Sequence, residues 1–356
     1  MGVGPHARHV TGETKGAAQP ADQDSLRAAT VGGVFRRMTS PSLARSARAD
    51  RQPLWREPGR TVTRLLHHDS TLGPILLAPG FVLLAVLMAY PFVYAVFLSF
   101  TGKRIGGPAN FVGFENYEKL TQTALFSKTV WNSIYYTVVA LVFKFVGGLA
   151  LASMLNRPFI GQRLAKALLL LPWIIPTVFS TLIWWWLFDP AFSIINEVLH
   201  KQWGLIAKPI PFLTDGATAM AALITVNVWR GVPFFGISFL AAMQAVPDEL
   251  LEAARVDGAS RWRSFWSITF PMIMPVVSVV CLISTIGTLG DFDLPYLLTK
   301  GGPNDATTMF AVTAYTLSLS SGLIGMGAAV SMTMFPLLVI LVIGSLLLVR
   351  RQQGVA

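Results

Sequence analysis

Three polar side chains recur at helical spacing in an otherwise apolar stretch near residue 280. Ser284, Thr288 and Asp291 stand at positions i, i+4 and i+7, with Gly287 beside them, among Val, Ile, Leu and Met residues. This spacing predicts that they share one face of a helix. Hydroxyl and carboxylate groups are too costly to direct at lipid, so this face should line a bundle interior or a wet cavity and contact polar solutes. Alternatively, Ser284 and Thr288 bond back to carbonyls of their own helix.

Two cations interrupt other apolar stretches of the chain. Arg230 lies near the middle of residues 217–243, at a predicted depth similar to that of Ser284, and Lys144 lies within residues 130–156. A guanidinium in apolar surroundings needs a partner, which would be an acid such as Asp291, helix-end carbonyls or oxygens of a solute. We expect Lys144 to extend its stem toward a polar neighbour. If both cations line one solute path, that path favours an anionic solute.

A further set of residues stands in the polar segment between two apolar stretches. Asp248 supplies a helix-start signal, and Gly258 is suited to the left-handed conformation that ends a helix. Ala253 and Ala254 keep one face small enough for close contact, and Glu252 adds an acid that would pair with a cation of a partner. We therefore predict two short helices, joined at Gly258, that dock on a cytoplasmic partner. The alternative is an amphipathic helix lying on lipid headgroups.

The sequence offers no set of residues expected to catalyse a reaction. The phosphate-binding pattern G-x-x-x-x-G-K-[ST] does not occur, so an ATPase would have to be another chain. His200 is the only one of the five histidines beyond residue 70, and the single Cys281 excludes an internal disulfide or a cysteine-based zinc site. Neither a metal cluster nor a nucleophilic triad nor a pair of acids near the membrane face is present, which disfavours a membrane-embedded enzyme.

The elements that must position these residues are membrane helices. The 356-residue chain is 53% hydrophobic and 13% charged, with a mean hydropathy of +0.56, whereas typical soluble domains are about 25% charged. This excludes an ordinary soluble enzyme. A membrane core of ~30 Å needs about 20 apolar residues, and six stretches suffice: residues 73–100, 130–156, 168–188, 217–243, 272–289 and 323–349. The sequence therefore predicts an all-α polytopic bundle of six transmembrane helices.

The distribution of Lys and Arg predicts the orientation of this bundle. Nineteen of the 28 Lys and Arg residues fall on the side that holds both termini, which should therefore be cytoplasmic. Residues 1–70 form a predicted disordered basic tail, unless translation begins at Met38, and residues 351–356 form a cytoplasmic end. Residues 71–350 form the membrane domain, with its docking loop at 244–271. The formal net charge of +10 reflects this topology and anionic lipid rather than nucleic acid.

The docking loop resembles that of inner-membrane permease subunits of binding-protein-dependent ABC importers. Their signature reads Glu-Ala-Ala, three residues, Gly, nine residues, Ile, one residue, Leu-Pro. It is matched by Glu252, Ala253, Ala254, Gly258, Ile268 and Pro271, with Phe270 in the leucine place. From about Gly73 to Arg350 the chain is similar to the carbohydrate branch, which includes maltose and glycerol-3-phosphate permeases. This similarity includes the segments 229–234, 257–260 and 298–303.

The resemblance implies a type I importer fold, a location in the bacterial inner membrane and a division of labour. An extracytoplasmic solute-binding protein would deliver a sugar, this chain and a second, different permease would form the path, and two ATPase subunits would bind ATP and Mg²⁺. This chain would bind no cofactor itself. Its implied coupling residues are Glu252, Ala253, Ala254, Asp257 and Gly258. The positions matching the sugar site of maltose permeases are Arg230, Gly231, Phe234, Ser284, Gly287, Thr288 and Asp291.

Two questions stay open at this level. Buried cations also occur in permeases for neutral sugars, so the charge of the solute is not decided by Arg230 and Lys144. An ion-coupled secondary transporter that uses Asp291, Arg230 and Lys144 is the alternative function. Such a transporter would need no structured docking loop, and six spans without an internal repeat fit a half-transporter better.

Overall fold

The computed structural model describes residues 69–353, and nearly all of them belong to helices or the turns between them. The predicted tail, apart from its last two residues, and residues 354–356 lie outside this range. Between residues 69 and 353 the only β pairing is a single bridge from Thr101 to Phe111. The elements in chain order are α2 (Asp69–Leu84), η1 (Ala85–Ala89), α3 (Tyr90–Ser99), α4 (Glu115–Thr121), α5 (Ala124–Leu155), α6 (Gln162–Ile174), α7 (Thr177–Phe188), α8 (Ile194–Asn196), η2 (Glu197–Gln202), α9 (Gly216–Gln244), α10 (Asp248–Val256), α11 (Arg261–Ser264), η3 (Phe265–Thr269), α12 (Phe270–Leu289), α13 (Asp293–Thr299), α14 (Phe310–Tyr315), η4 (Thr316–Ser320) and α15 (Ile324–Gln353).

The number of candidate membrane spans agrees with the six that the sequence predicts when a bent pair of helices is counted as one span. Five helical rods are long and apolar enough to cross a bilayer, and a bent pair, α6 and α7, supplies a sixth if it is taken as one span. In hydrocarbon, helices satisfy their backbone hydrogen bonds internally, which explains why this apolar sequence is helical almost throughout. The all-α bundle predicted from hydropathy is confirmed.

The span predicted over residues 168–188 is present as two helices, α6 and α7, with a sharp bend between them. The chain breaks between α6 and α7, and the two helices meet at an angle of 90°. The cause is local: Pro176 has no N–H to donate, and Ile175, the residue before it, adopts an extended conformation with φ −62° and ψ 126°. The Thr177 hydroxyl, at the start of α7, consequently faces α9.

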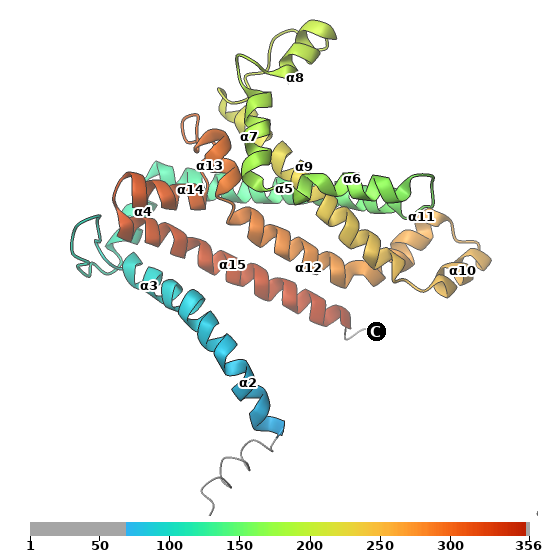
Figure 1. Ribbon diagram of the computed structural model, residues 1–356, viewed down its shortest axis with the longest axis horizontal. Coiled ribbons are helices and arrows are strands. Elements are labelled where there is room, and N and C mark those ends of the chain that lie inside the picture. The colour runs from blue at the N-terminus through green and yellow to red at the C-terminus, as the bar shows by residue number, and fades with distance from the viewer. Residues whose placement is uncertain (1–68, 354–356) are drawn as a thin grey trace, which may run out of the picture. The chain divides into compact units, whose positions relative to one another are not determined.

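Close packing of α5 against α9 forms the centre of the bundle, and α12 lies beside both (Figure 1). Two glycines permit this approach. A Cβ atom on Gly148 of α5 would lie 2.3 Å from the Cβ of Phe235, and one on Gly236 of α9 would lie 2.5 Å from Leu151 Cδ2. Small residues serve this purpose at helix contacts in membranes, where packing rather than the hydrophobic effect holds helices together.

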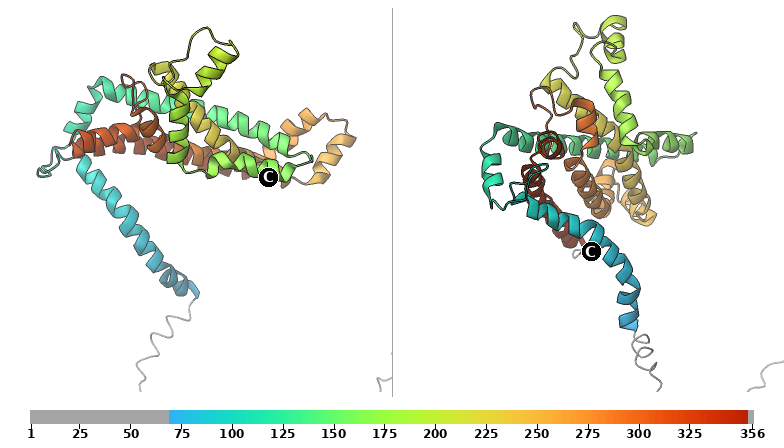
Figure 2. Two further views of the ribbon diagram at one scale, coloured as in Figure 1. Left: turned by 45° about the horizontal axis from the view of Figure 1, so that its top comes forward. Right: turned by 60° about the vertical axis from the view of Figure 1, so that its left-hand side comes forward.

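The first span stands at the edge of the bundle. Its α3 end packs along α15, whereas its α2 end extends away from the other helices (Figure 2). None of the apolar window within Leu76–Ser99 is buried inside the chain. This surface is therefore available to lipid or to another membrane chain.

Candidate functional site

A buried lysine joins the three central helices. Lys144 of α5 is 3% exposed, and its Nζ donates a hydrogen bond of 2.8 Å to Thr288 Oγ1 of α12. Its stem crosses α9 at Gly231, where a Cβ atom would lie 2.2 Å from Lys144 Cδ. The expectation that Lys144 reaches a polar neighbour is confirmed. The structure thus brings together Gly231 and Thr288, two of the predicted path residues, through a lysine between them.

Arg230 contacts the break in the bent span, and Asp291, one of the partners considered for it, is not its hydrogen-bond partner. Its guanidinium donates a hydrogen bond of 2.7 Å to Thr177 Oγ1, at the start of α7. Its Nε atom is buried and has no hydrogen-bond partner. No ion pair links Arg230 to Asp291 among residues 69–353, where the ion pairs are Lys119 with Glu115 and Lys201 with Glu197.

Asp291 enters the bundle from a loop rather than from the helix that precedes it. Helix α12 ends at Leu289, so the predicted i+7 position lies beyond the last helical turn. One carboxylate oxygen accepts a hydrogen bond of 3.3 Å from the Leu294 N–H. The other accepts long hydrogen bonds from the Tyr136 hydroxyl, at 3.4 Å, and from Asn227 Nδ2, at 3.5 Å.

Tyr136 and Asn227 were missed by sequence reasoning. Tyr136 precedes Lys144 by two helical turns on α5, and Asn227 precedes Arg230 by about one turn on α9. Both side chains are buried, at 1% and 8% exposure, and Asn227 Oδ1 has no hydrogen-bond partner. The signal that could have found them is their spacing from the two cations, since residues three, four or seven to eight apart share a helix face.

The other predicted path residues do not join this cluster by direct hydrogen bonds. Ser284 is half-buried, and Gly287 is exposed with open space around it. Phe234 stacks on Trp173 of α6, with ring centroids 5.8 Å apart and ring planes 16° apart. These three positions lie nearer the outside of the chain than Lys144 and Thr288 do.

The loop between α9 and α12 has the predicted form of two short helices joined at Gly258. Gly258 has φ +78°, and the Ala259 N–H bonds to the Ala254 carbonyl at 2.9 Å while the Gly258 N–H bonds to Arg255. This pair of bonds is a Schellman motif, which closes the end of α10. Ser260 then caps α11, because its Oγ accepts a hydrogen bond from the Arg263 N–H.

The loop presents most of its predicted coupling residues to the outside. Glu252, Ala253, Asp257 and Gly258 are exposed, whereas Ala254 is 8% exposed and faces the protein. Val256, on the same helix, is 88% exposed. An exposed acidic and apolar surface on a rigid, capped helix is suited to contact with another protein.

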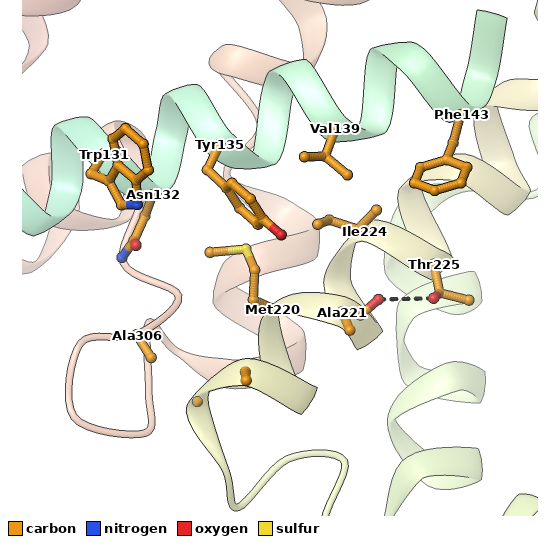
Figure 3. A pocket seen from close by; sticks show the side chains of 12 residues that line it. Trp131, Asn132, Tyr135, Val139, Phe143, Met220, Ala221, Ile224, Thr225 and Ala306 are labelled. Carbon is orange, nitrogen blue, oxygen red and sulfur yellow. Dashed lines mark hydrogen bonds between the residues drawn. The ribbon is translucent and has the colours of Figure 1, made fainter. Parts of the chain in front are cut away.

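Two cavities adjoin α5 and α9, and neither is lined by a predicted path residue. The larger, of about 550 Å³, lies between the N-terminal parts of these helices, where Tyr135 and Trp131 face Met220 and its neighbours (Figure 3). Its lining is largely apolar, and the Thr225 hydroxyl already bonds to the Ala221 carbonyl. The second, of about 420 Å³, lies between α5, α6 and α9, with Trp229 and Val232 in its lining. It therefore lies next to the segment that holds Arg230 and Gly231.

Comparison with known proteins gives consistent matches. The family described as "Binding-protein-dependent transport system inner membrane component" matches residues 144–354. The sulfoquinovosyl glycerol transport system permease protein of Agrobacterium fabrum is 35% identical, over 76% of this chain and 87% of its own. The trehalose/maltose transport system permease protein of Thermococcus litoralis is 30% identical, over 77% of this chain and 92% of its own.

A solved structure shares the fold. One chain of a bacterial ABC transporter involved in the import of the acidic polysaccharide alginate superposes with a TM-score of 0.70. The match covers 82% of this chain and 99% of that one, at 23% sequence identity. The same transporter was also solved in complex with a periplasmic protein that carries an alginate pentasaccharide, with a TM-score of 0.69.

Proposed function

The chain belongs to the family of inner membrane components of binding-protein-dependent transport systems, and from this premise we propose that it forms half of the translocation path of an ATP-driven importer for a sugar or sugar-like solute. As a member of this family it is a multi-pass permease subunit of an ABC importer in the inner membrane. The ion-coupled secondary transporter is not favoured, because the relatives are permeases of this importer class.

The observation that carries the sugar class is the identity of 30% or more to permeases named for sulfoquinovosyl glycerol and for trehalose or maltose. These names include one anionic and two neutral solutes, so they support a sugar without giving its charge. The polar cluster around Lys144, Thr288 and Asp291 supplies donors and acceptors in the middle of an apolar bundle, as passage of a hydroxyl-rich solute requires.

Coupling to ATP hydrolysis is proposed to occur at α10. Two separate ATPase subunits would bind ATP and Mg²⁺ and receive α10 in a cleft, with Glu252 paired to a cation of the ATPase and Ala253 allowing close contact. Asp257 and Gly258 fix the turn that follows. A capped helix between two spans transmits movement of its partner to α9 and α12 as a rigid body.

The rest of the assembly follows from the same proposal. A second permease, of different sequence, would complete the path, and an extracytoplasmic solute-binding protein would deliver the sugar. Both termini would then lie in the cytoplasm, on the side of the docking loop. The tail and this chain's own part of the path would hold no cofactor.

Purification of the chain from its native membrane in mild detergent tests this proposal. We expect a P-loop ATPase and a second six-span permease to co-purify, and the sample to hydrolyse ATP. We expect vesicles that hold the assembly to accumulate a sugar only when ATP and the binding protein are supplied. A chain that purifies alone and moves solute without ATP would contradict the importer function.

A further inference from the structure

A buried lysine and a half-buried arginine lie on the central helices α5 and α9 without a carboxylate in direct contact, as far as the described residues extend. Lys144 has three ammonium donors, and its hydrogen bond to the neutral Thr288 hydroxyl uses one of them. Arg230 donates to another neutral hydroxyl, that of Thr177, and its Nε has no acceptor. The ion pairs within residues 69–353 are both on exposed helix surfaces elsewhere.

One carboxylate, that of Asp291, reaches the helices that carry the two cations, but a single negative charge does not balance both. Its oxygens accept hydrogen bonds from Tyr136 of α5, Asn227 of α9 and the Leu294 N–H. Two cations and one carboxylate leave the cluster with one excess positive charge. Asp293, the next acid along the chain, is exposed.

An excess charge inside a membrane protein is costly unless an anion is brought to it. We propose that, within the importer function proposed above, this cluster binds the acidic group of an anionic sugar, a carboxylate or sulfonate, with Lys144 Nζ as its main donor. The inference rests on that function and adds the chemical class of the solute. A second permease that supplied a carboxylate to Lys144 would be the competing way to balance the charge.

The geometry around Lys144 suits a binding role. Gly231 gives the lysine stem room to cross α9, and Thr288 holds the ammonium between the three helices. The 420 Å³ cavity is lined by Trp229 and Val232, which flank Arg230 and Gly231 in the chain. Gly147, which also lines this cavity, follows Lys144 by three residues on α5.

A matched pair of disaccharides tests the proposal. Cellobiouronic acid carries a carboxylate where cellobiose carries a hydroxymethyl group, and the two are otherwise alike. We expect the assembled transporter, purified with its partner subunits, to bind the acid at least about tenfold more tightly, as one charged hydrogen bond provides. We expect Lys144→Met, which keeps an unbranched side chain over Gly231, to abolish this preference.

Two further variants serve as controls for assembly. Lys144→Arg retains the positive charge and should retain a preference for the acid. Lys128→Met removes an exposed lysine of the same helix, whose Nζ bonds to the Asn304 carbonyl, and should leave the preference unchanged. Equal or tighter binding of cellobiose, failure to bind the acid, or a preference that survives Lys144→Met would overturn the proposal.

Uptake measurements separate this inference from the importer function itself. ATP-dependent uptake of neutral sugars alone would leave the importer in place and refute the anionic class. Absence of ATP-dependent uptake of any sugar, from a chain that co-purifies with no ATPase, would refute the proposed function and the inference together.

Discussion

At the scale of single residues, the candidate path depends on one glycine and one lysine. The flexible stem of Lys144 occupies the space that any side chain at position 231 would need. The ammonium can therefore reach Thr288 only because position 231 has no Cβ atom. Lys144 and Gly231 thus act as a pair, and a change in either should displace the same positive charge.

Gly231→Ala tests this pairing. The added methyl group must push Lys144 off its position and break its bond to Thr288, and we expect a loss of about 1–3 kcal/mol of stability, as overpacking usually costs. The unfolding temperature of the purified assembly and its rate of solute uptake should both fall. Gly344→Ala on α15, where a Cβ atom would meet nothing within 4 Å, is the control and should not lower the unfolding temperature. Equal unfolding temperatures for the two variants would contradict the pairing.

At the scale of elements, α10 and the broken α6–α7 span both differ from a straight membrane-spanning helix. The Schellman motif and the Ser260 cap make the docking loop rigid. The break at Pro176 exposes Thr177, which binds Arg230 and thereby ties the bent span to α9. Movement of α9 by a partner on α10 would therefore also reach α7.

Glu252→Lys tests the role of α10. Reversal of this exposed charge should repel the cation with which it is proposed to pair, and we expect retention of ATPase subunits to weaken about tenfold or more. Uptake should fall with it, while membrane insertion stays normal. Glu118→Lys makes the same charge change on α4, where the residue is also exposed, and should have no effect on retention. Normal uptake by Glu252→Lys would show that the docking surface lies elsewhere.

At the scale of the whole molecule, a large apolar surface faces outward. Leu87, Trp131, Val142 and Ile340 are among its members, each more than half exposed. In a soluble protein such a surface would cause aggregation, but in a membrane it contacts lipid tails or a second permease. The described chain is thus suited to contact lipid tails or another membrane chain over this surface.

The proposed orientation predicts which loops are accessible from each side. In a Cys281→Ser background, which removes the only cysteine, we expect an impermeant maleimide to label Trp203→Cys in spheroplasts. Ile160→Cys, in the loop after α5, should be labelled only in inverted vesicles. Both positions are well exposed and lie outside α10, so access rather than burial decides the labelling. The reverse pattern would invert the assigned topology.

The sequence alone determined the class of fold and the position of the docking loop. Hydropathy gives the spans because lipid forces backbone hydrogen bonds inside helices, and the cap and turn residues of α10 act locally, so Gly258 could be placed without a structure. Only the tertiary structure decided what the two cations, Lys144 and Arg230, contact. The side-chain partners of Lys144, Arg230 and Asp291 lie between 53 and 155 residues away in the chain, so they depend on how α5, α7, α9 and α12 pack. Spacing along one helix could not reveal that Lys144 crosses Gly231, that Arg230 binds Thr177, or that Tyr136 and Asn227 bond to Asp291.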